Sequence, residues 1–140
     1  MEKNQYKEYV HEVAMALYNF QLIEMALKEY ICTAIKQIKE KVQGSIPFKY
    51  DKSFVEKDSL GALISKYEKM NDNHEIISEL KRLKPHRDKL AHQGLVLSHK
   101  DWNDKFQIAI RISDLKQIRE ETRLILQKII ADQKKIENVN

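Results

Sequence analysis

Apolar residues recur at steps of three and four, or multiples near them, through the first 40 residues. This is the period of an amphipathic α-helix, which we expect from about Asn4 to Val42. The stripe consists of Val10, Val13, Leu17, Phe20, Leu27, Ile31, Ile35, Ile38 and Val42. Additional apolar side chains widen it in the middle, namely Met15, Tyr18, Leu22, Ile23 and Met25. The middle of this helix is therefore expected to be covered on more than one side, either inside a bundle or by a partner subunit.

Turn residues divide the next part of the chain. Gly44 and Pro47 end the first helix and open a connection of about a dozen residues. A short helix follows, with Asp58 or Ser59 as its N-cap, and a third helical pattern starts near residue 74. Because proline lacks an amide hydrogen and crowds the preceding turn, Pro85 predicts either a kink or the start of a separate helix.

The C-terminal part combines two patterns. Ile108, Ile110 and Ile112 alternate with polar residues, which is typical of a brief strand. Ser113 is then a plausible N-cap for a final helix, whose apolar stripe consists of Leu115, Ile118, Ile125, Ile129 and Ile136. The last long element is thus predicted to begin only after residue 113.

Composition agrees with a helical fold. The 140 residues include three glycines and two prolines, too few for the turns of an all-β domain. We therefore expect one domain over residues 1–140, an all-α bundle of four to five helices with long N- and C-terminal helices. No apolar run is long enough to span a bilayer and the polar start is unlike a signal peptide, so a cytoplasmic protein without membrane contact is expected.

Positive charge is concentrated in one segment. Lys81 to His92 contains five cations and one anion, a net charge of +4, which equals the formal charge of the whole chain. Such a patch attracts phosphates, although a solvated helix face rich in lysine has the same composition.

Several kinds of chemistry find no support in the sequence. No glycine-rich loop follows a strand, so nucleotide cradling of the P-loop or dinucleotide kind is not indicated. The five histidines form no helical i, i+4 pair, and the single cysteine, Cys32, cannot build a thiolate zinc cluster. We therefore predict neither a metal nor a cofactor, and we interpret Cys32 as a small core residue.

The stretch RDKLAHQG, residues 87–94, joins two groups suited to phosphodiester chemistry. A guanidinium such as that of Arg87 stays charged and matches phosphate oxygens, and an imidazole such as that of His92 can exchange a proton near neutrality. Asp88, four residues before His92, is placed to hold one ring nitrogen. With RNA, a 2′-hydroxyl can attack its own phosphate when a base takes its proton and a cation steadies the added negative charge. Five residues correspond to about 140° around a helix, so convergence of Arg87 and His92 depends on side-chain reach and a helix end.

The segment LKPHRDKLAHQGL, preceded by a helical SLGALISKYEK and a long N-terminal helix, resembles the HEPN superfamily. These are all-α domains with an Arg, four to six intervening residues and a His. Arg87, Asp88 and His92 match this motif, with Asp88 where Asn is commonest. The resemblance implies a homodimer in which Arg and His of both protomers line a cleft. It also implies a metal-independent endoribonuclease of toxin-antitoxin or phage-defence systems, and a nucleotidyltransferase-like protein as a frequent antitoxin.

The sequence thus nominates Arg87, His92 and Asp88 as catalytic residues, and the neighbouring Arg82, Lys84, His86 and Lys89 as RNA contacts. Three alternatives remain open. The domain is a non-catalytic dimeric module that binds RNA, a nucleotide or a protein, or it is a structural component of a larger helical assembly, or the motif merely terminates a helix. Trp102 and Phe106 either stack on a base or, as we expect, cover the open end of the bundle.

Overall fold

A computed structural model describes residues 3–93 and 103–137. Within these ranges the chain is all-α, as predicted, and no strand occurs. The α-helices are α1 (Lys3–Val42), α2 (Leu60–Lys69), α3 (His74–Gln93) and α5 (Lys105–Glu137), with a short 3-10 helix, η1, at Lys52–Phe54. The two longest are α1 and α5, with 40 and 33 residues, so the prediction of long N- and C-terminal helices is confirmed.

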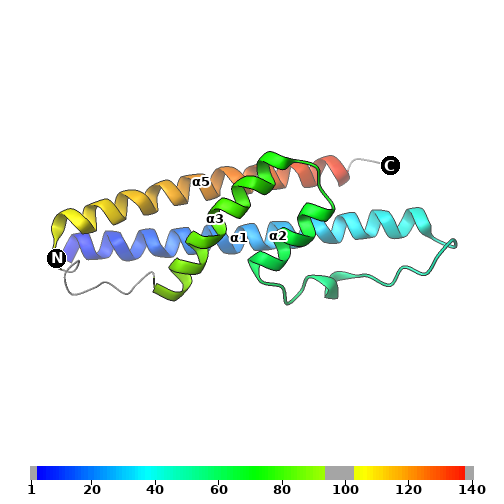
Figure 1. The fold of residues 1–140 in the computed structure, drawn as a ribbon, viewed down its shortest axis with the longest axis horizontal. Helices are drawn as coiled ribbons and strands as arrows, with labels where there is room; N and C mark the ends of the chain where they lie inside the picture. The colour runs from blue at the N-terminus through cyan, green and yellow to red at the C-terminus, as the bar shows by residue number, and fades with distance from the viewer. Residues whose placement is uncertain (1–2, 94–102, 138–140) are drawn as a thin grey trace.

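The helices α1 and α5 lie side by side and run in the same direction (Figure 1). Contacts between them follow the whole length of the pair, from Gln5 at Lys105 to Gln37 at Ile136. Parallel neighbours need a long crossover, which here contains η1, α2 and α3. The shorter helices α2 and α3 pack against the long pair, and α3 extends from α2 toward the N-terminal end of α1 (Figure 1).

The main core lies where all four α-helices meet. Its fully buried members include Phe20, Leu27, Leu63, Leu80 and Ile125. A second, smaller cluster joins the N-terminal halves of the long helices and consists of Tyr9, Val13, Ile108, Ile112 and Leu115. The side chain of Leu90, on α3, packs against both clusters. The C-terminal half of α3 is therefore anchored to the scaffold by its apolar face.

A buried polar contact sets the register of the long pair. Asn19 of α1 donates its amide to the carbonyl oxygen of Arg119 at 3.0 Å and to Oγ1 of Thr122 at 3.1 Å. Both Asn19 and Thr122 are buried, with 8% and 0% of their surface exposed. Sliding α5 by one turn would leave the amide of Asn19 without these partners in the interior, which costs about 1–3 kcal/mol.

The predicted strand at residues 108–112 is wrong, because these residues belong to α5. Ile108, Ile112 and Leu115 are spaced four and three residues apart, so they share the helix face that packs on α1, whereas Ile110 is 53% exposed. The N-cap is Asp104 rather than Ser113, since its carboxylate accepts hydrogen bonds from the backbone N–H groups of Phe106 and Gln107 at 3.0 and 3.2 Å.

Other helix ends match the sequence more closely. Gly44 has a φ of +80° just beyond α1, a left-handed conformation that glycine adopts without strain. Ser59 is the N-cap residue of α2 but makes no side-chain cap hydrogen bond, and Asp58 instead pairs with Lys66 at 2.7 Å. Pro85 lies inside α3, which continues to Gln93, so no separate helix begins there.

Candidate phosphate-binding faces of α3

The Arg87–His92 motif occupies the last turns of α3. The helix begins after Asn73, whose side chain accepts a hydrogen bond from the backbone N–H of Ile76 at 3.2 Å. Ile76, Leu80 and Leu83 bury the apolar face of α3 in the core. Since the helix is continuous, each residue from 82 to 92 has a fixed direction around its axis, and those directions decide which predicted site residues meet.

Arg87 faces α1. Its guanidinium Nη2 lies 3.4 Å from Oε1 of Glu24, and its Nη1 lies 3.6 Å from Oδ1 of Asp88. The side chains of Arg87 and Glu24 are 30% and 19% exposed. Two carboxylates thus hold the guanidinium in place while part of it remains accessible.

Asp88 does not play the predicted role of holding the imidazole of His92. Its Oδ2 accepts a hydrogen bond from Nζ of Lys84 at 2.7 Å, and its other oxygen faces Arg87. The hydrogen bond from Lys84 and the positive charges of Lys84 and Arg87 hold the pKa of this carboxyl below its usual range. Asp88 is therefore an anion that organises cations on α3, because a lysine one turn earlier competes for it.

His92 lies in the last turn of α3 and is exposed. Over residues 3–93 and 103–137, no hydrogen bond or ion pair joins it to Asp88 or Arg87. The continuous helix keeps the two motif residues about 140° apart around its axis. The helix end at Gln93 does not redirect them, and within one chain the guanidinium points to α1 while the imidazole points to solvent.

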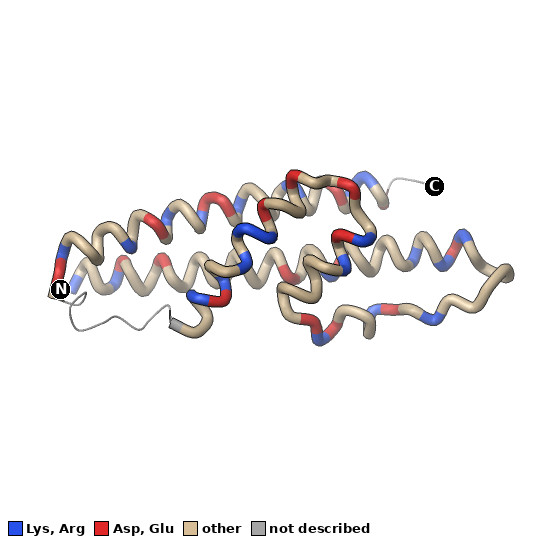
Figure 2. The backbone as a smooth tube through the Cα atoms, viewed as in Figure 1, with Lys and Arg blue, Asp and Glu red and all other residues tan. Residues whose placement is uncertain are grey.

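Acidic positions alternate with basic ones along α3 and its neighbouring helices (Figure 2), and four of the five cations of the basic stretch form ion pairs. Its lysines and arginines pair with Glu68 on α2, Glu121 on α5, Asp88 on α3 itself and Glu24 on α1. The corresponding cations are Lys81, Arg82, Lys84 and Arg87, at distances of 2.9, 3.2, 2.7 and 3.4 Å. Among the five cations, Lys89 makes no ion pair with any described residue. A uniform basic patch, as the sequence suggested, is therefore not what the fold presents.

The four predicted RNA contacts separate onto two sides of α3. Arg82, His86 and Lys89 face α5 and line a cavity of about 470 Å³ between the two helices. Lys84 faces α2, where its Cε lies 2.7 Å from the position of a Cβ built on Gly61. Neither Arg87 nor His92 lines the cavity. The sequence-predicted site residues thus fall into three groups. Arg87, Asp88 and Lys84 form a cluster with Glu24 of α1, His92 is exposed, and Arg82, His86 and Lys89 line a separate groove.

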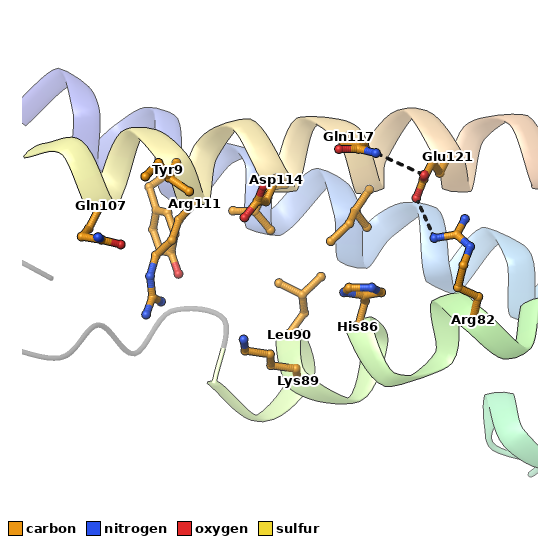
Figure 3. A pocket seen from close by; sticks show the side chains of 13 residues that line it. Tyr9, Arg82, His86, Lys89, Leu90, Gln107, Arg111, Asp114, Gln117 and Glu121 are labelled. Atoms are coloured by element: carbon orange, nitrogen blue, oxygen red, sulfur yellow. Dashed lines mark hydrogen bonds and ion pairs between the residues drawn. The ribbon is translucent and has the colours of Figure 1, made fainter. Parts of the chain in front are cut away.

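Apolar side chains form the floor of this α3–α5 groove, and polar groups line its walls (Figure 3). Tyr9, Leu90, Leu115 and Ile118 contribute apolar surface. One end is closed by a hydrogen-bonded series in which Glu121 accepts from Arg82 at 3.2 Å and from Gln117 at 3.4 Å. Arg111, Asp114 and Gln107 of α5 line the remainder, opposite Lys89 of α3.

Sequence reasoning missed the acidic partners of α3 and the α5 wall of the groove. Glu24 lies between the buried residues Ile23 and Ala26. A carboxylate at the margin of an apolar stripe was the one feature of the sequence that could have indicated its contact with another helix. Arg111 lies within the expected strand and Asp114 lies just after it. Because a helix was not expected before residue 113, the sequence did not indicate that these two side chains share a helix face. Phe106 is 83% exposed, so it does not cover the end of the bundle, and Trp102 lies outside the described residues.

Among the described residues, no group of three or more His, Cys, Asp or Glu side chains is arranged to hold a metal ion. None of the described helices combines the length and apolarity needed to cross a membrane. No family model, curated protein or solved structure was found to match the chain. The site has to be interpreted from its own geometry.

Proposed function

We propose that this protein is a metal-independent endoribonuclease of the HEPN kind, with a toxin-antitoxin or phage-defence role, whose reaction site is completed by a second copy of the chain. The observation that carries the proposal is the state of the two motif residues. Arg87 is held by Glu24 and Asp88 yet stays partly exposed, and His92 is exposed at the end of the same helix.

The chemistry needs one guanidinium and imidazoles near a single phosphate. A neutral His92 takes the proton of an RNA 2′-hydroxyl as its oxygen attacks the adjacent phosphorus. Arg87 stabilises the negative charge that builds on the phosphoryl oxygens. The bond from phosphorus to the 5′-oxygen then breaks, and a protonated imidazole delivers a proton to that oxygen. The products are a 2′,3′-cyclic phosphate and a 5′-hydroxyl, and no water or metal enters this step.

A second copy is needed because one chain directs Arg87 and His92 about 140° apart. In a symmetric pair, the two α3 helix ends would face one another across the twofold axis, so that Arg87 of one chain meets His92 of the other. Two histidines in one cleft also supply the base and the acid at the same time.

The decisive experiment uses complementation in the presence of excess chelator. Arg87→Ala and His92→Ala are each expected to lose cleavage of a single-stranded RNA while remaining folded. When the two variants are mixed and allowed to exchange subunits, a composite site regains one Arg87–His92 pair. Its single imidazole has to take the 2′-hydroxyl proton and then deliver it to the 5′-oxygen, so activity returns only to a fraction of the parent. Full activity in either single variant, or a protein that light scattering shows to be a monomer while it cleaves RNA, contradicts the proposal.

The second candidate is a dimeric HEPN-like module that binds RNA, a nucleotide or a protein without cleaving. The neutralised guanidinium of Arg87 and its divergence from His92 favour this alternative. Binding that survives His92→Ala, with no cyclic-phosphate product from the parent protein, would support it. For either candidate, a nucleotidyltransferase-like antitoxin is the proposed protein partner, and co-expression with such a protein followed by co-purification tests it.

A further inference from the structure

Phe106 exposes an aromatic ring at the start of α5. Its side chain is 83% exposed, and that of Ile110, one turn later, is 53% exposed. Gln107 and Ala109 lie between them and are also exposed and uncharged. Single apolar residues are common on the surface of a soluble protein, but contiguous apolar surface more often marks a contact site. The exposed side of α5 from residue 106 to residue 110 is therefore a candidate interface.

This apolar surface adjoins the α3–α5 groove. Ile110 lines the groove, so apolar surface continues from the exposed side of α5 into the cavity. The floor beyond it consists of Leu90, Leu115 and Ile118, and the cavity volume of about 470 Å³ has room for an aromatic side chain. Phe106 does not line the groove of its own chain. One face of the protein thus carries an apolar projection and, next to it, an apolar hollow.

A projection and a hollow on the same face fit a second copy of the chain. When two copies meet across a twofold axis, each uses the same surface, so a projection beside a hollow fills the hollow of the other copy. The axis then passes between the two features, close to Ile110. Equivalent residues meet at such an axis, and like charges there would repel one another. The run from Phe106 to Ile110 contains no charged residue, so this part of α5 meets the requirement.

The spacing along α5 agrees with this arrangement. Phe106 precedes Ile110 by four residues, about 6 Å of helix. An axis perpendicular to α5 at Ile110 brings residue 106 of one copy opposite residue 114 of the other. In Figure 3, Leu90 of α3 lies across the groove from the stretch between Asp114 and Gln117. A phenylalanine ring inserted at this level reaches the apolar floor.

We infer that two copies of the chain associate through this face, with Phe106 of each copy in the α3–α5 groove of the other. The two Ile110 side chains are in contact at the axis. Two buried phenylalanine rings account for about 300–500 Å², which is well below the roughly 1,200 Å² of a stable complex. The flanks of the groove add to this area, but the association is weak, with a Kd on the order of 10 µM.

The contact goes beyond the proposed nuclease site and does not depend on it. The guanidinium of Arg87 lies on the side of α3 that faces Glu24 of α1, whereas the groove lies on the side that faces α5. A pair formed through the ends of α3 and a pair formed through Phe106 therefore use different surfaces. If both form, the assembly contains four copies. With the Phe106 contact alone it contains two.

Charge at the axis tests the inference. At about 100 µM protein, roughly tenfold above the expected Kd, the parent should have close to twice the mass of a variant that lacks the contact. Ile110→Glu and Ile110→Lys each place like charges at the axis, so each alone should show half the parent mass. An equimolar mixture of the two should regain the parent mass, because a glutamate of one copy then meets a lysine of the other. Analytical ultracentrifugation measures each sample.

Further variants locate the projection and the hollow. Phe106→Glu removes the projection, and His86→Trp fills the groove from an exposed position on α3, so both should halve the mass. Leu124→Glu is the matched control. Leu124 is 44% exposed, lies five turns further along the same face of α5 and does not line the groove, so this variant should keep the parent mass. Circular dichroism checks that each variant is folded.

Three results would overturn the inference. The first is a parent with the same mass as Phe106→Glu. The second is a mixture of the two Ile110 variants that stays dissociated, because a twofold axis at this residue requires rescue by opposite charges. The third is an equal loss of mass in Leu124→Glu, which indicates a general effect of charge on α5. RNA cleavage separates the two proposals: Phe106→Glu should cleave like the parent, and a parent without cleavage that still shows this pattern of masses contradicts the nuclease alone.

Discussion

Arg87 on α3 and Glu24 on α1 form an ion pair of 3.4 Å that ties the proposed catalytic guanidinium to the longest helix of the fold. Glu24 is the less exposed partner, at 19%, and it lies beside the core residue Ile23. Since the guanidinium contacts Asp88 as well, its orientation is set by two carboxylates from different helices. Glu24 is therefore a positioning residue for the proposed phosphate contact.

The first prediction concerns this pair. Glu24→Gln removes the charge that orients Arg87, so we expect kcat for RNA cleavage to fall roughly tenfold while KM changes less. Glu24→Asp keeps the charge and should restore part of the loss. Steady-state cleavage of a labelled RNA over a range of RNA concentrations measures kcat and KM for each variant.

The control for this prediction is Glu29→Gln, also on α1. Glu29 contacts Gln133 of α5 at 3.4 Å, on the side of α1 away from α3. The Glu29→Gln variant therefore removes an equal charge from α1 without touching the partners of Arg87. Its activity should equal that of the parent. Equal losses in Glu24→Gln and Glu29→Gln would show that the charge of α1, rather than the orientation of Arg87, matters.

A second prediction concerns the buried carboxylate of Glu12, which is 3% exposed. Its Oε1 lies 3.1 Å from Nη1 of Arg119, and its Oε2 is buried without a hydrogen-bond partner among the described residues. Arg119→Ala leaves this charge unpaired in the interface of the long helices, and we expect a loss of about 2 kcal/mol in the free energy of unfolding. Urea denaturation at neutral pH measures the loss.

A neighbouring variant checks the cause. Lys116→Ala breaks a pair of similar length, 2.8 Å to Glu8, but both its side chains are about half exposed. It should leave stability close to that of the parent. An equal loss of stability in Lys116→Ala would instead show that burial of the Glu12 carboxylate does not set the cost.

The third prediction concerns alkaline stability. Burial raises the pKa of Tyr67, and the charge of Asp132, 3.3 Å from its hydroxyl, raises it further. Burial likewise raises the pKa of Tyr30, whose ring meets that of Tyr67 at 4.8 Å. A raised folded-state pKa gives a contribution that is complete below the unfolded value of about 10 and is lost as the pH rises above it. Stability should therefore fall above pH 10.

Tyr67→Phe isolates that effect. The variant should cost about 1 kcal/mol at neutral pH for the lost hydrogen bond, and its stability should fall less steeply above pH 10. Tyr18→Phe changes an exposed side chain and should reproduce the alkaline curve of the parent. Guanidinium titrations between pH 7 and 11.5 compare the three proteins. Parallel curves for Tyr67→Phe and the parent would exclude Tyr67 as a source of the alkaline loss.

Helices with long apolar stripes were predictable from the sequence because buried positions recur every three or four residues over many turns. The apolar stripe therefore predicted the bounds of α1 closely. The helix begins at Lys3, where Asn4 was expected, and it ends at Val42 as expected. The prediction of a strand at residues 108–112 was wrong because three isoleucines at alternate positions fit both a strand and a helix. The choice between them depended on Tyr9 and Val13, which pack there from the other end of the chain.

The candidate site was predictable in part for a similar reason. The sequence places Arg87 and His92 on the last turns of a helix, and the structure agrees. Their partners depend on helix packing: Glu24 reaches Arg87 from α1, and Glu121 reaches Arg82 from α5. Local spacing suggested that Asp88 would hold His92 at i+4, but the equally spaced Lys84 at i−4 is charged and binds the carboxylate instead.

The last prediction concerns Gly61, in the first turn of α2. A Cβ at this position would lie 2.7 Å from Cε of Lys84, so the lysine has to move, and as a flexible side chain that is 42% exposed it can do so. Gly61→Ala should displace Lys84 from Asp88 and raise the pKa of Asp88 toward its ordinary value, since that hydrogen bond is the largest cause of the lowering. The glycine has no positive φ, so alanine should also stabilise the fold by about 0.5–1 kcal/mol, because it reduces the conformational entropy of the unfolded chain.

NMR titration measures the pKa of Asp88, and urea denaturation measures the stability of Gly61→Ala. Lys84→Gln is the matched variant, which should give the same pKa change without the gain in stability. A destabilised Gly61→Ala protein with an unchanged Asp88 would mean that Lys84 does not yield, and that the α2–α3 contact is tighter than the exposure of this side chain implies.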